Sequence, residues 1–384
     1  MRIALFDYLV VPTNAVGNCD RTMLEGLADE HEFTVFAIEF DNPRPDRIRF
    51  VRIPAPKHPL FLMYLVYFFL APIVLFLHRR REHVTFDAVQ SIESIMPSAT
   101  ILYSHFCHRA YLRDHWQATR PSGARRIARW LNHQLFSLME PIVYRRAQQV
   151  VVPSRGLARE LSAIYAGILP KSGVQVIANP VNIARMRPEA NFDRVGFRRD
   201  LGFQTGDLVL VFAALGHFER KGLPLLLEAL AKSECPQIKL IVVGGSPGMI
   251  EEYTTRATQL DIADRIAFVG LQRDVRPYLW AADVFAFPSS YEVFPLVSLE
   301  AAAAGLPLLS SRLHGVEEFL VDGVNGWTIE RDASLITARL RQLAAEPDKL
   351  VAVGQAAADS VRMYSTDAFV AAWRQFYLNL PSRT

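Results

Sequence analysis

The chain has 384 residues, which is long for one hydrophobic core and predicts two domains of ordinary size. It is 51% hydrophobic and 21% charged, so it should fold as a globular protein, and a disordered chain is excluded. The net charge is only +3, but residues 1–200 carry +8 and the rest carry −5. We therefore expect the first half to face lipid head groups or an anionic saccharide. Nucleic acid is not expected, because the sequence contains no nucleic-acid-binding motif.

The start of the chain and its cysteines predict a cytoplasmic protein. Residues 1–6 are too short an apolar run for a secretory signal, and we expect them to form the first buried strand. The three cysteines, Cys19, Cys107 and Cys235, are widely spaced. They form neither a disulfide framework nor a zinc motif, which favours a reducing compartment.

Apolar runs alternate with helical patterns through the first half, which is typical of βαβ units with a parallel sheet. The strands expected there are 3–6, 32–38, 88–91, 100–105 and 149–152. The loop 14–18 follows the first strand and contains Gly17 and Asn18. By itself it is explained by an ordinary strand-to-helix turn.

A long apolar segment follows. Residues 59–77 carry no charged side chain, and His-Arg-Arg-Arg follows at 78–81. The segment barely reaches the length of a membrane span, and we expect Pro72 to divide it. Its aromatic residues and basic end suit an interfacial helix beside anionic lipid. Three interpretations stay open: docking of 59–81 on the inner face of a membrane, a buried core helix, and a true span.

Two histidines, His105 and His108, follow the expected strand at 100–104. A His-x-x-His pair can suggest a metal, but no third ligand is evident, so the spacing alone is weak evidence. A histidine whose hydrogen bonds are satisfied at a strand end is the other interpretation.

The polar region 183–205 is expected to connect two domains. A second alternating series follows, with strands expected at 208–213, 239–243, 266–269, 284–287, 307–310 and 326–329. The last helical pattern, 367–378, is rich in aromatic residues.

The strand 208–213 leads into Gly216 and then into the adjacent cations Arg220 and Lys221. Cations at a strand-to-helix turn suit a diphosphate, because they neutralise it and a glycine permits its close approach. They would also stabilise the negative charge that develops when a sugar–phosphate bond breaks. A lone Arg-Lys pair is more often two surface residues.

The segment 288–307 contains a polar loop and a helix with two glutamates, Glu292 and Glu300. We expect the helix to begin near Pro295, since proline suits the first helical position, and to end at Gly305. Amides of the first turn can bind phosphate, and carboxylates accept hydrogen bonds from sugar hydroxyls. A nucleotide-sugar fits this arrangement, whereas a bare glutamate pair is more often two solvated acids.

The segment 288–307 resembles the Glu-x7-Glu motif of retaining GT-B enzymes of glycosyltransferase family 4, including the small residues and the Gly-Leu-Pro that follow it. The resemblance covers nearly the whole chain and is strongest for 208–327. It implies that Glu300 holds the ribose of the donor and that Glu292 lies beside the transferred sugar.

The resemblance implies further roles. Arg220 and Lys221 match the cations that bind the donor diphosphate, and His105 matches a histidine near the transferred sugar, with His108 as the second candidate. The remaining donor-binding assignments are Gly17, Asn18, Gly216, Arg273, Phe294, Leu296 and Val297. Family enzymes work without a bound metal, so neither a metal nor another cofactor is expected.

Three positions depart from the family's pattern. Val293 and Pro295 stand where glycine is frequent, and His217 stands where an arginine often occurs. Pro295 cannot donate an N–H, unlike the residue that is usual at that place.

We predict an α/β protein with the GT-B fold, in which two Rossmann-like doubly wound domains face each other across a cleft. Residues 1–190 would bind the acceptor and residues 191–364 the nucleotide-sugar, with a C-terminal helix in 365–384 packing back on the first domain. The expected activity is retaining transfer from a UDP- or GDP-sugar to a saccharide or lipid-linked acceptor, in surface polysaccharide or glycolipid synthesis.

Two other functions remain open at this stage. One is a non-catalytic GT-B subunit that binds a nucleotide-sugar at a membrane. The other is a GT-B epimerase, which the context of the two glutamates disfavours.

Overall fold

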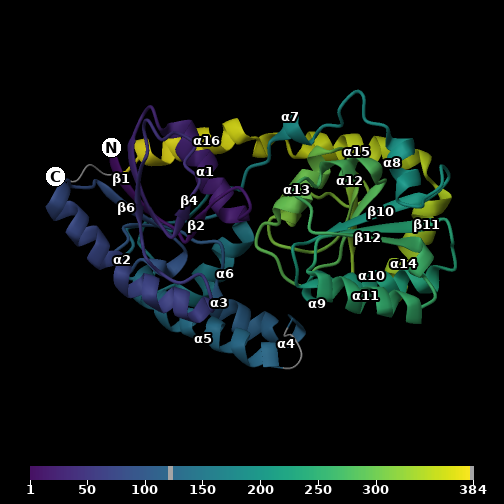
Figure 1. Ribbon diagram of the computed structural model, residues 1–384, viewed down its shortest axis with the longest axis horizontal. Helices are drawn as coiled ribbons and strands as arrows, with labels where there is room; N and C mark the ends of the chain where they lie inside the picture. Colours follow the sequence, from purple (N-terminus) through teal and green to yellow (C-terminus); the bar gives the residue numbers. More distant parts are fainter. Residues whose placement is uncertain (120–123, 381–384) are drawn as a thin grey trace. The chain divides into compact units, whose positions relative to one another are not determined.

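The computed structural model of the protein describes residues 1–119 and 124–380 (Figure 1). The chain divides into two compact units, the first comprising Met1–Pro180 with Thr366–Thr384 and the second comprising Val181–Ser365. Each unit combines helices with a parallel sheet, so the predicted α/β class is confirmed.

The first unit is built on a parallel sheet with the strand order β5-β3-β1-β6-β7-β8-β9. Its strands are β1 (Arg2–Phe6), β3 (Glu32–Ala37), β5 (Arg49–Arg52), β6 (Ala88–Ile92), β7 (Ile101–Tyr103), β8 (Gln149–Val152) and β9 (Val174–Val176). The central strands are mainly apolar and buried on both faces, as expected for a parallel sheet covered by helices. The strand order reverses between β1 and β6, which makes their carboxyl ends a topological switch point, where ligands bind in such sheets.

Helices cover this sheet. They are α1 (Ala15–Leu27), α2 (Leu60–Glu82), α3 (His108–Ala110), α4 (Trp116–Thr119), α5 (Ala124–Tyr144), α6 (Arg155–Tyr165) and α16 (Thr366–Leu378). The unit also contains the helical turns Glu93–Ile95 and Tyr111–His115, and a small parallel pair of β2 (Leu9–Val10) and β4 (Glu39–Phe40).

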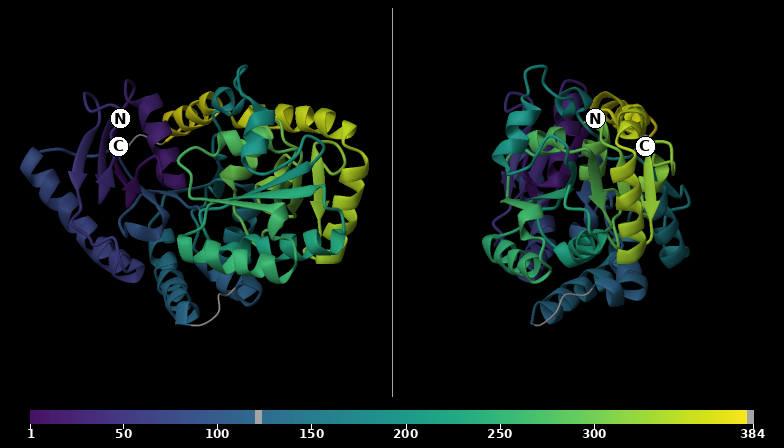
Figure 2. Two further views of the ribbon diagram at one scale, coloured as in Figure 1. Left: turned by 45° about the vertical axis from the view of Figure 1, so that its right-hand side comes forward. Right: turned by 90° about the vertical axis from the view of Figure 1, so that its right-hand side faces the viewer.

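The last helix, α16, belongs to the first unit and lies beside α1 (Figures 1 and 2). Trp373 is fully buried, and the Tyr377 hydroxyl donates a hydrogen bond to Gln90 Oε1 at 2.7 Å. The two helices approach closely because α1 has Gly26 at the contact, where a Cβ would lie 2.6 Å from the Val370 side chain.

The apolar segment forms α2, one continuous helix with Pro72 inside it. The expected division at Pro72 is wrong. Proline removes one backbone hydrogen bond, but buried residues on both sides of it, Phe68 and Leu75 among them, hold the two halves in line. Its mean hydropathy of 2.6 and its length would allow it to cross a membrane, although a third of the apolar window is buried inside the unit.

The second unit is built on a parallel sheet with the strand order β12-β11-β10-β13-β14-β15. Its strands are β10 (Leu208–Ala213), β11 (Ile238–Val243), β12 (Ile266–Gly270), β13 (Val284–Phe287), β14 (Leu308–Ser311) and β15 (Gly326–Ile329). The order reverses between β10 and β13, so this sheet is also doubly wound. Its helices are α7 (Ile183–Met186), α8 (Arg194–Asp200), α9 (Phe218–Lys221), α10 (Leu223–Ser233), α11 (Pro247–Gln259), α12 (Arg276–Ala281), α13 (Leu296–Ala303), α14 (Ala333–Ala345) and α15 (Asp348–Ser360), with shorter turns at Ala263–Arg265, Val316–Glu318 and Arg362–Tyr364.

The polar region 183–205, expected as a connection, is part of the second unit and contains α7 and α8. Trp280 Nε1 donates to the carbonyl of Met186 at 2.7 Å, and Arg198 Nε donates to the carbonyl of Ala281 at 2.6 Å. These contacts attach the region to the second unit, so the division between the units falls earlier than residue 190.

Truncation of the buried Trp373 side chain tests the contribution of α16 to the first unit. Trp373→Ala should lower the free energy of unfolding by about 3–5 kcal/mol, because a large aromatic side chain leaves a cavity. Urea denaturation measures the change. Gln375→Ala, at an exposed position of the same helix, is the control and should change it by less than about 0.5 kcal/mol. Equal effects of the two substitutions would show that α16 packs only loosely on the unit.

Candidate active site

In the second unit, the carboxyl ends of the adjacent strands β10 and β13 bring two loops together. Gly222 has φ +87°, and a Cβ there would lie 2.2 Å from the carbonyl oxygen of Pro288. The amide of Ser290 also donates to the carbonyl of Arg220 at 2.8 Å. The loop after β10 and the loop after β13 therefore form one connected structure at the switch point.

This structure holds a cluster of Arg220, Lys221 and Glu292. Lys221 Nζ lies 2.7 Å from Glu292 Oε1, and Arg220 Nη1 lies 3.5 Å from the same oxygen. Ser289 Oγ donates to that oxygen at 2.9 Å, and Arg220 Nη1 donates to the carbonyl of Tyr291 at 2.6 Å. The three charged side chains are only 11–19% exposed. Three predicted site residues thus lie in direct contact.

The electrostatics of the cluster follow from burial and pairing. Burial raises the pKa of Glu292, but Lys221 and Arg220 lower it by more, so the net pKa lies below the ordinary value. Burial lowers the pKa of Lys221, and the nearby carboxylate opposes that shift. Glu292 is therefore ionised at neutral pH and is stabilised by both cations.

Glu300 lies within α13 and is partly buried. Burial raises its pKa, and the charges that act on it are Arg185 on α7 and Asp274 after β12. Helices α7 and α13 are in contact, so part of the region expected as a linker contributes to the surroundings of Glu300.

The start of α13 is close to the prediction. The helix runs from Leu296, with Pro295 as its N-cap residue, and the amides of Leu296 and Val297 lie in its first turn. Phe294 is buried, with its ring 5.6 Å from that of Tyr364. Gly315, with φ +76°, makes room for it, since a Cβ there would lie 2.4 Å from the Phe294 ring. The structure thus gives Phe294 a packing role.

Two further predicted donor residues lie in loops at the carboxyl edge of the second sheet. Gly216 is in the loop after β10, and Arg273 is exposed in the loop after β12. Gly244 and Gly245, which directly follow β11, both have positive φ. A Cβ at Gly244 would lie 1.9 Å from the carbonyl oxygen of Ala214, so this glycine lets the end of β11 pack on the loop after β10.

In the first unit, His105 lies just after β7 and is 9% exposed. Its Nε2 lies 3.3 Å from Asn179 Oδ1, and its backbone amide donates to Glu93 Oε1 at 2.9 Å. Burial lowers the pKa of His105 to about 4, so the imidazole is neutral at neutral pH. Its Nδ1 is buried and has no hydrogen-bond partner, which leaves one ring nitrogen for a ligand or water.

Sequence reasoning missed Glu93, which directly follows β6 beside the end of β7. It has φ +56°, an uncommon conformation for a residue other than glycine, and such strain is found mostly at functional sites. Its carboxyl group accepts hydrogen bonds from the His105 amide and from Ser104 Oγ, at 2.9 and 3.3 Å. Glu93 therefore positions the loop that carries His105, and nothing in the local sequence indicates this.

His108 is turned to a different partner. Its Nδ1 lies 2.9 Å from Nδ1 of His133 on α5, and its amide donates to Glu140. The two histidines of the His-x-x-His pair therefore have separate surroundings. Among the described residues, no group of three or more His, Cys, Asp or Glu side chains could hold a metal.

Gly17 and Asn18 lie in the first turn of α1. The amide of Gly17 donates to Asn14 Oδ1 at 2.9 Å, and the amide of Asn18 donates to the carbonyl of Asn14 at 2.8 Å. A Cβ at Gly17 would lie 2.0 Å from the carbonyl oxygen of Leu9. The glycine is explained by this close packing, and both amides already have partners within the capped helix.

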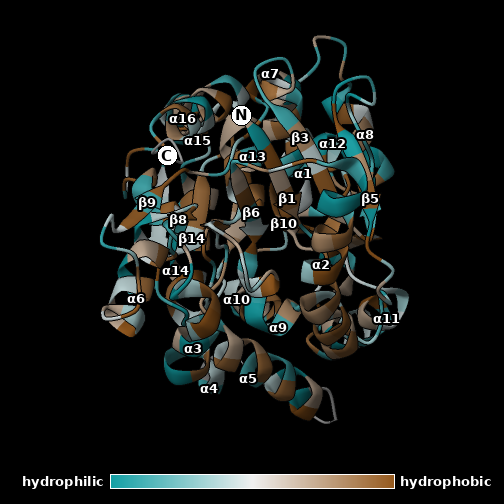
Figure 3. Ribbon diagram, turned by 90° about the vertical axis from the view of Figure 1, so that its left-hand side faces the viewer, coloured by the Kyte–Doolittle hydropathy of each residue, from teal (hydrophilic) through white to brown (hydrophobic). Residues whose placement is uncertain are grey.

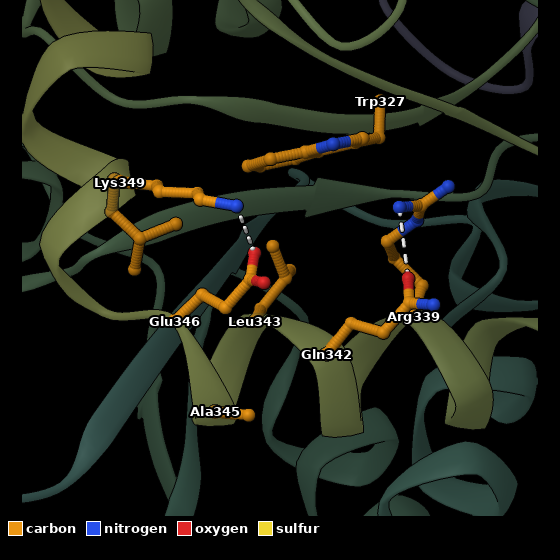
Figure 4. Close-up of a pocket in the computed structure, with 8 residues that line it drawn as sticks. Trp327, Arg339, Gln342, Leu343, Ala345, Glu346 and Lys349 are labelled. Atoms are coloured by element: carbon orange, nitrogen blue, oxygen red, sulfur yellow. Dashed lines mark hydrogen bonds and ion pairs between the residues drawn. The ribbon is translucent and has the colours of Figure 1, made fainter.

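A surface pocket of about 340 Å³ lies elsewhere in the second unit (Figure 4). Trp327 near the start of β15 covers one side, and residues at the end of α14 and the start of α15, including Glu346 and Lys349, form the other. A helix that follows a parallel strand runs back toward the amino edge of the sheet, so this pocket, at the end of α14 and near the start of β15, lies away from the carboxyl edge that carries the charged cluster. None of the predicted site residues lines it.

The titration of Glu93 gives a test of its surroundings. Burial raises its pKa from 4.5 to about 8, so the folded protein keeps a proton that the unfolded chain releases. The retained proton stabilises the folded protein. This contribution to the free energy of unfolding is fully present below pH 4.5 and is lost as the pH rises through about 8. Glu93→Gln cannot titrate, so its free energy of unfolding should rise relative to the wild type by on the order of 3 kcal/mol between about pH 5 and pH 8.

Urea denaturation at both pH values measures this difference. Other buried acids, such as Glu140, titrate in both proteins, so their contributions to the difference in the free energy of unfolding largely cancel. A difference between variant and wild type that stays constant with pH would contradict the burial of a protonated Glu93.

Comparisons with known proteins agree with this architecture. Residues 206–346 match the family described as glycosyl transferases group 1, and residues 17–185 match glycosyltransferase family 4. An uncharacterised glycosyltransferase of Methanocaldococcus jannaschii is 25% identical over 356 residues, which cover 88% of this chain and 87% of that protein.

Solved structures show the same fold. WaaG, a glycosyltransferase involved in lipopolysaccharide biosynthesis, superposes with a TM-score of 0.77 at 18% identity, over 98% of this chain and all of that one. HepE of Anabaena in complex with UDP-glucose superposes with a TM-score of 0.72 at 18% identity, over 99% of this chain and all of that one. The two family matches and the shared fold agree, and the chain belongs to the family 4 glycosyltransferases with the GT-B fold.

Proposed function

We propose that this glycosyltransferase moves a sugar, with retention of anomeric configuration, from a UDP- or GDP-sugar to a saccharide or lipid-linked acceptor in surface polysaccharide or glycolipid synthesis. The observation that carries the proposal is the buried Arg220–Lys221–Glu292 cluster at the switch point of the second sheet. The UDP-glucose bound by HepE supports a nucleotide-sugar donor, and the role of WaaG in lipopolysaccharide synthesis supports the acceptor class.

In this proposal Lys221 and Arg220 bind the donor diphosphate. Two cations share one carboxylate oxygen, so the cluster keeps a net positive charge for an anionic ligand. As the sugar–phosphate bond breaks, negative charge grows on the leaving diphosphate, and fixed cations stabilise that charge. The leaving phosphate then takes the proton of the acceptor hydroxyl, so the reaction needs no separate general base.

The other residues bind the two sugars of the donor. We assign Glu292 to hydroxyls of the transferred sugar and Glu300 to the ribose, since carboxylates accept hydrogen bonds from hydroxyls. The amides of Leu296 and Val297 at the start of α13 are suited to a phosphate oxygen. His105, held by Glu93 in the first unit, is our candidate for a further contact with the transferred sugar.

We further propose a cytoplasmic enzyme that binds peripherally to the inner face of a membrane and uses neither a metal nor another cofactor. The compartment is supported by the cysteines, because Cys19, Cys107 and Cys235 form no disulfide. The exposed apolar face of α2 supports the membrane partner.

A non-catalytic subunit that binds a nucleotide-sugar is the second candidate. It is favoured by Pro295, which caps α13 without a side-chain hydrogen bond and has no N–H for the donor. Slow hydrolysis of a nucleotide-sugar by the purified protein separates the two functions, because a pure binding module releases no sugar.

Substitutions in the cluster test the assigned roles. Lys221→Ala should lower turnover at least about 100-fold and weaken UDP or GDP binding, because it removes a cation from the diphosphate site. Glu292→Gln should lower turnover similarly but bind the nucleotide at least as tightly, because it leaves both cations uncompensated. Turnover is measured by release of the nucleotide, and affinity by calorimetric titration.

Lys349→Ala is the matched control, since Lys349 and Glu346 form a pair of similar length, 2.8 Å, with both side chains more than half exposed. It should leave turnover and nucleotide affinity unchanged. Circular dichroism checks that each variant is folded. If Lys221→Ala or Glu292→Gln turned over the donor as fast as the wild type, the role assigned to that residue would be refuted.

A screen of UDP-, GDP- and ADP-sugars by thermal unfolding tests the donor class. A ligand at about a hundred times its dissociation constant adds about 2.7 kcal/mol to the stability of the native state, which raises the melting temperature measurably. We expect a shift with a UDP- or GDP-sugar and none with the ADP-sugars. With the donor known, the anomeric proton coupling of the first product, measured by NMR, tests retention, and an inverted product would refute it.

A further inference from the structure

Helix α2 has two apolar faces, and only one is buried in the first unit. The buried face includes Tyr64 and Tyr67. The opposite face is exposed, with Phe69, Ile73 and Leu77 exposed by 66%, 53% and 58%. These three residues follow each other at intervals of four, so they lie along one side of the helix. Surface helices normally place polar residues on that side.

Helix α5 continues the exposed apolar surface. It lies beside α2 in the first unit, and the rings of Tyr64 and Phe136 have centroids 3.9 Å apart (Figures 1 and 3). Ile127, Leu131 and Leu138 on α5 are exposed by 65%, 53% and 60%. Their spacing of four and seven residues places them on one side of that helix. The apolar surface therefore extends over two neighbouring helices.

Basic side chains border this surface. Arg79, Arg80 and Arg81 occupy the last turn of α2, and the Arg80 guanidinium lies 4.7 Å from the centroid of the Phe76 ring. On α5 the acid is Glu140, whose side chain is buried. An apolar stripe with arginines at its end suits an anionic lipid surface, in which apolar side chains enter the acyl boundary and arginines contact head groups.

The buried face of α2 argues against a transmembrane span. The Tyr67 hydroxyl donates to the carbonyls of Asp7 and Phe36 at 3.0 and 2.6 Å, and the Tyr64 hydroxyl donates to the carbonyl of Ser94 at 3.2 Å. A spanning α2 would lose these bonds and leave polar groups unpaired. The helix can lie in the plane of an interface with the whole unit folded.

We propose that α2 and α5 together form a docking surface for an anionic lipid bilayer, with both helices lying along the interface. A bilayer is favoured over a second copy of the chain, because a second copy would bring the same three arginines and only one exposed acid on these helices, Glu82, which already pairs with Arg81 at 3.6 Å. Tyr67 and Tyr64 link α2 to the chain just after β1 and β6, so the lipid would lie close to the switch point of the first unit. If the proposed function holds, this favours a lipid-linked acceptor over a free saccharide.

Sedimentation of the purified full-length protein with vesicles tests the surface without any donor or acceptor, so it is independent of transfer activity. The protein should bind vesicles of equimolar phosphatidylcholine and phosphatidylglycerol more tightly than vesicles of phosphatidylcholine alone, and salt should weaken binding. Extraction of the bound protein with alkaline carbonate should release it, whereas a spanning helix would be retained.

Two variants test the apolar side chains and the arginines of the surface separately. Phe69→Asp with Ile73→Asp should abolish binding to both kinds of vesicle. Arg80→Glu with Arg81→Glu should weaken binding to the anionic vesicles at least about 25-fold, since each arginine contributes about fivefold near such a surface. Val351→Asp, at an exposed apolar position on α15, and Arg199→Glu, at an exposed position on α8, are the controls and should bind like the wild type.

Several results would overturn the proposal. One is that the wild type does not bind anionic vesicles. Another is that the surface variants bind as tightly as the controls. The third is that light scattering shows a dimer, which Phe69→Asp with Ile73→Asp converts to a monomer. If the aspartate variant does not fold, as judged by circular dichroism, the arginine variant still decides the question, because its side chains are exposed.

Discussion

The buried carboxylate of Glu292 is the constraint on which the candidate active site depends. Removing a charge from water is unfavourable unless opposite charges and hydrogen bonds compensate, and here Lys221, Arg220 and Ser289 all contact one oxygen. The compensation works only if two loops from different strands meet closely, which the missing side chain of Gly222 permits. The carboxylate in turn keeps the two cations ordered. Binding of a diphosphate would then be an exchange of partners between groups already in place, which lowers the cost of ordering them.

Much of this arrangement could be predicted from the sequence. Long runs of buried apolar residues, such as those of β10 and β11, predict parallel strands, and parallel strands bring their carboxyl ends to one edge. Residues in the segments that follow such strands, including Lys221 after β10 and Glu292 after β13, are therefore expected to converge. The same reasoning places His105 at the edge of the first sheet. The local sequence pattern is sufficient for this prediction, because the direction of a strand determines at which edge of the sheet the residues after it lie.

Other features depend on tertiary contacts that no local pattern contains. The left-handed conformation of Glu93 is stabilised by hydrogen bonds from the His105 amide and Ser104, which are distant in the sequence. The resemblance assigned Gly17 to donor binding, and the structure shows that its amide donates to Asn14. The region 183–205 has the composition of a linker, yet α7 and α8 pack on the second unit. The polar composition of a segment predicts only that most of its residues are exposed to solvent. A single buried contact, such as the hydrogen bond from Trp280 to Met186, can still hold the segment against a domain.

The surroundings of helix α2 also could not be predicted from its sequence. Its sequence is apolar on all sides, so periodicity could not separate a core helix from an interfacial or spanning one. The structure separates the faces through specific polar contacts, since Tyr67 can reach the carbonyl of Asp7 only from one side of the helix. Among the described residues of the first unit, none makes a comparable polar contact with the opposite face, and its Phe69 and Ile73 are exposed. Exposed apolar area of this extent is unfavourable in water, so its retention beside a cluster of arginines is best explained by a surface that supplies both hydrocarbon and negative charge.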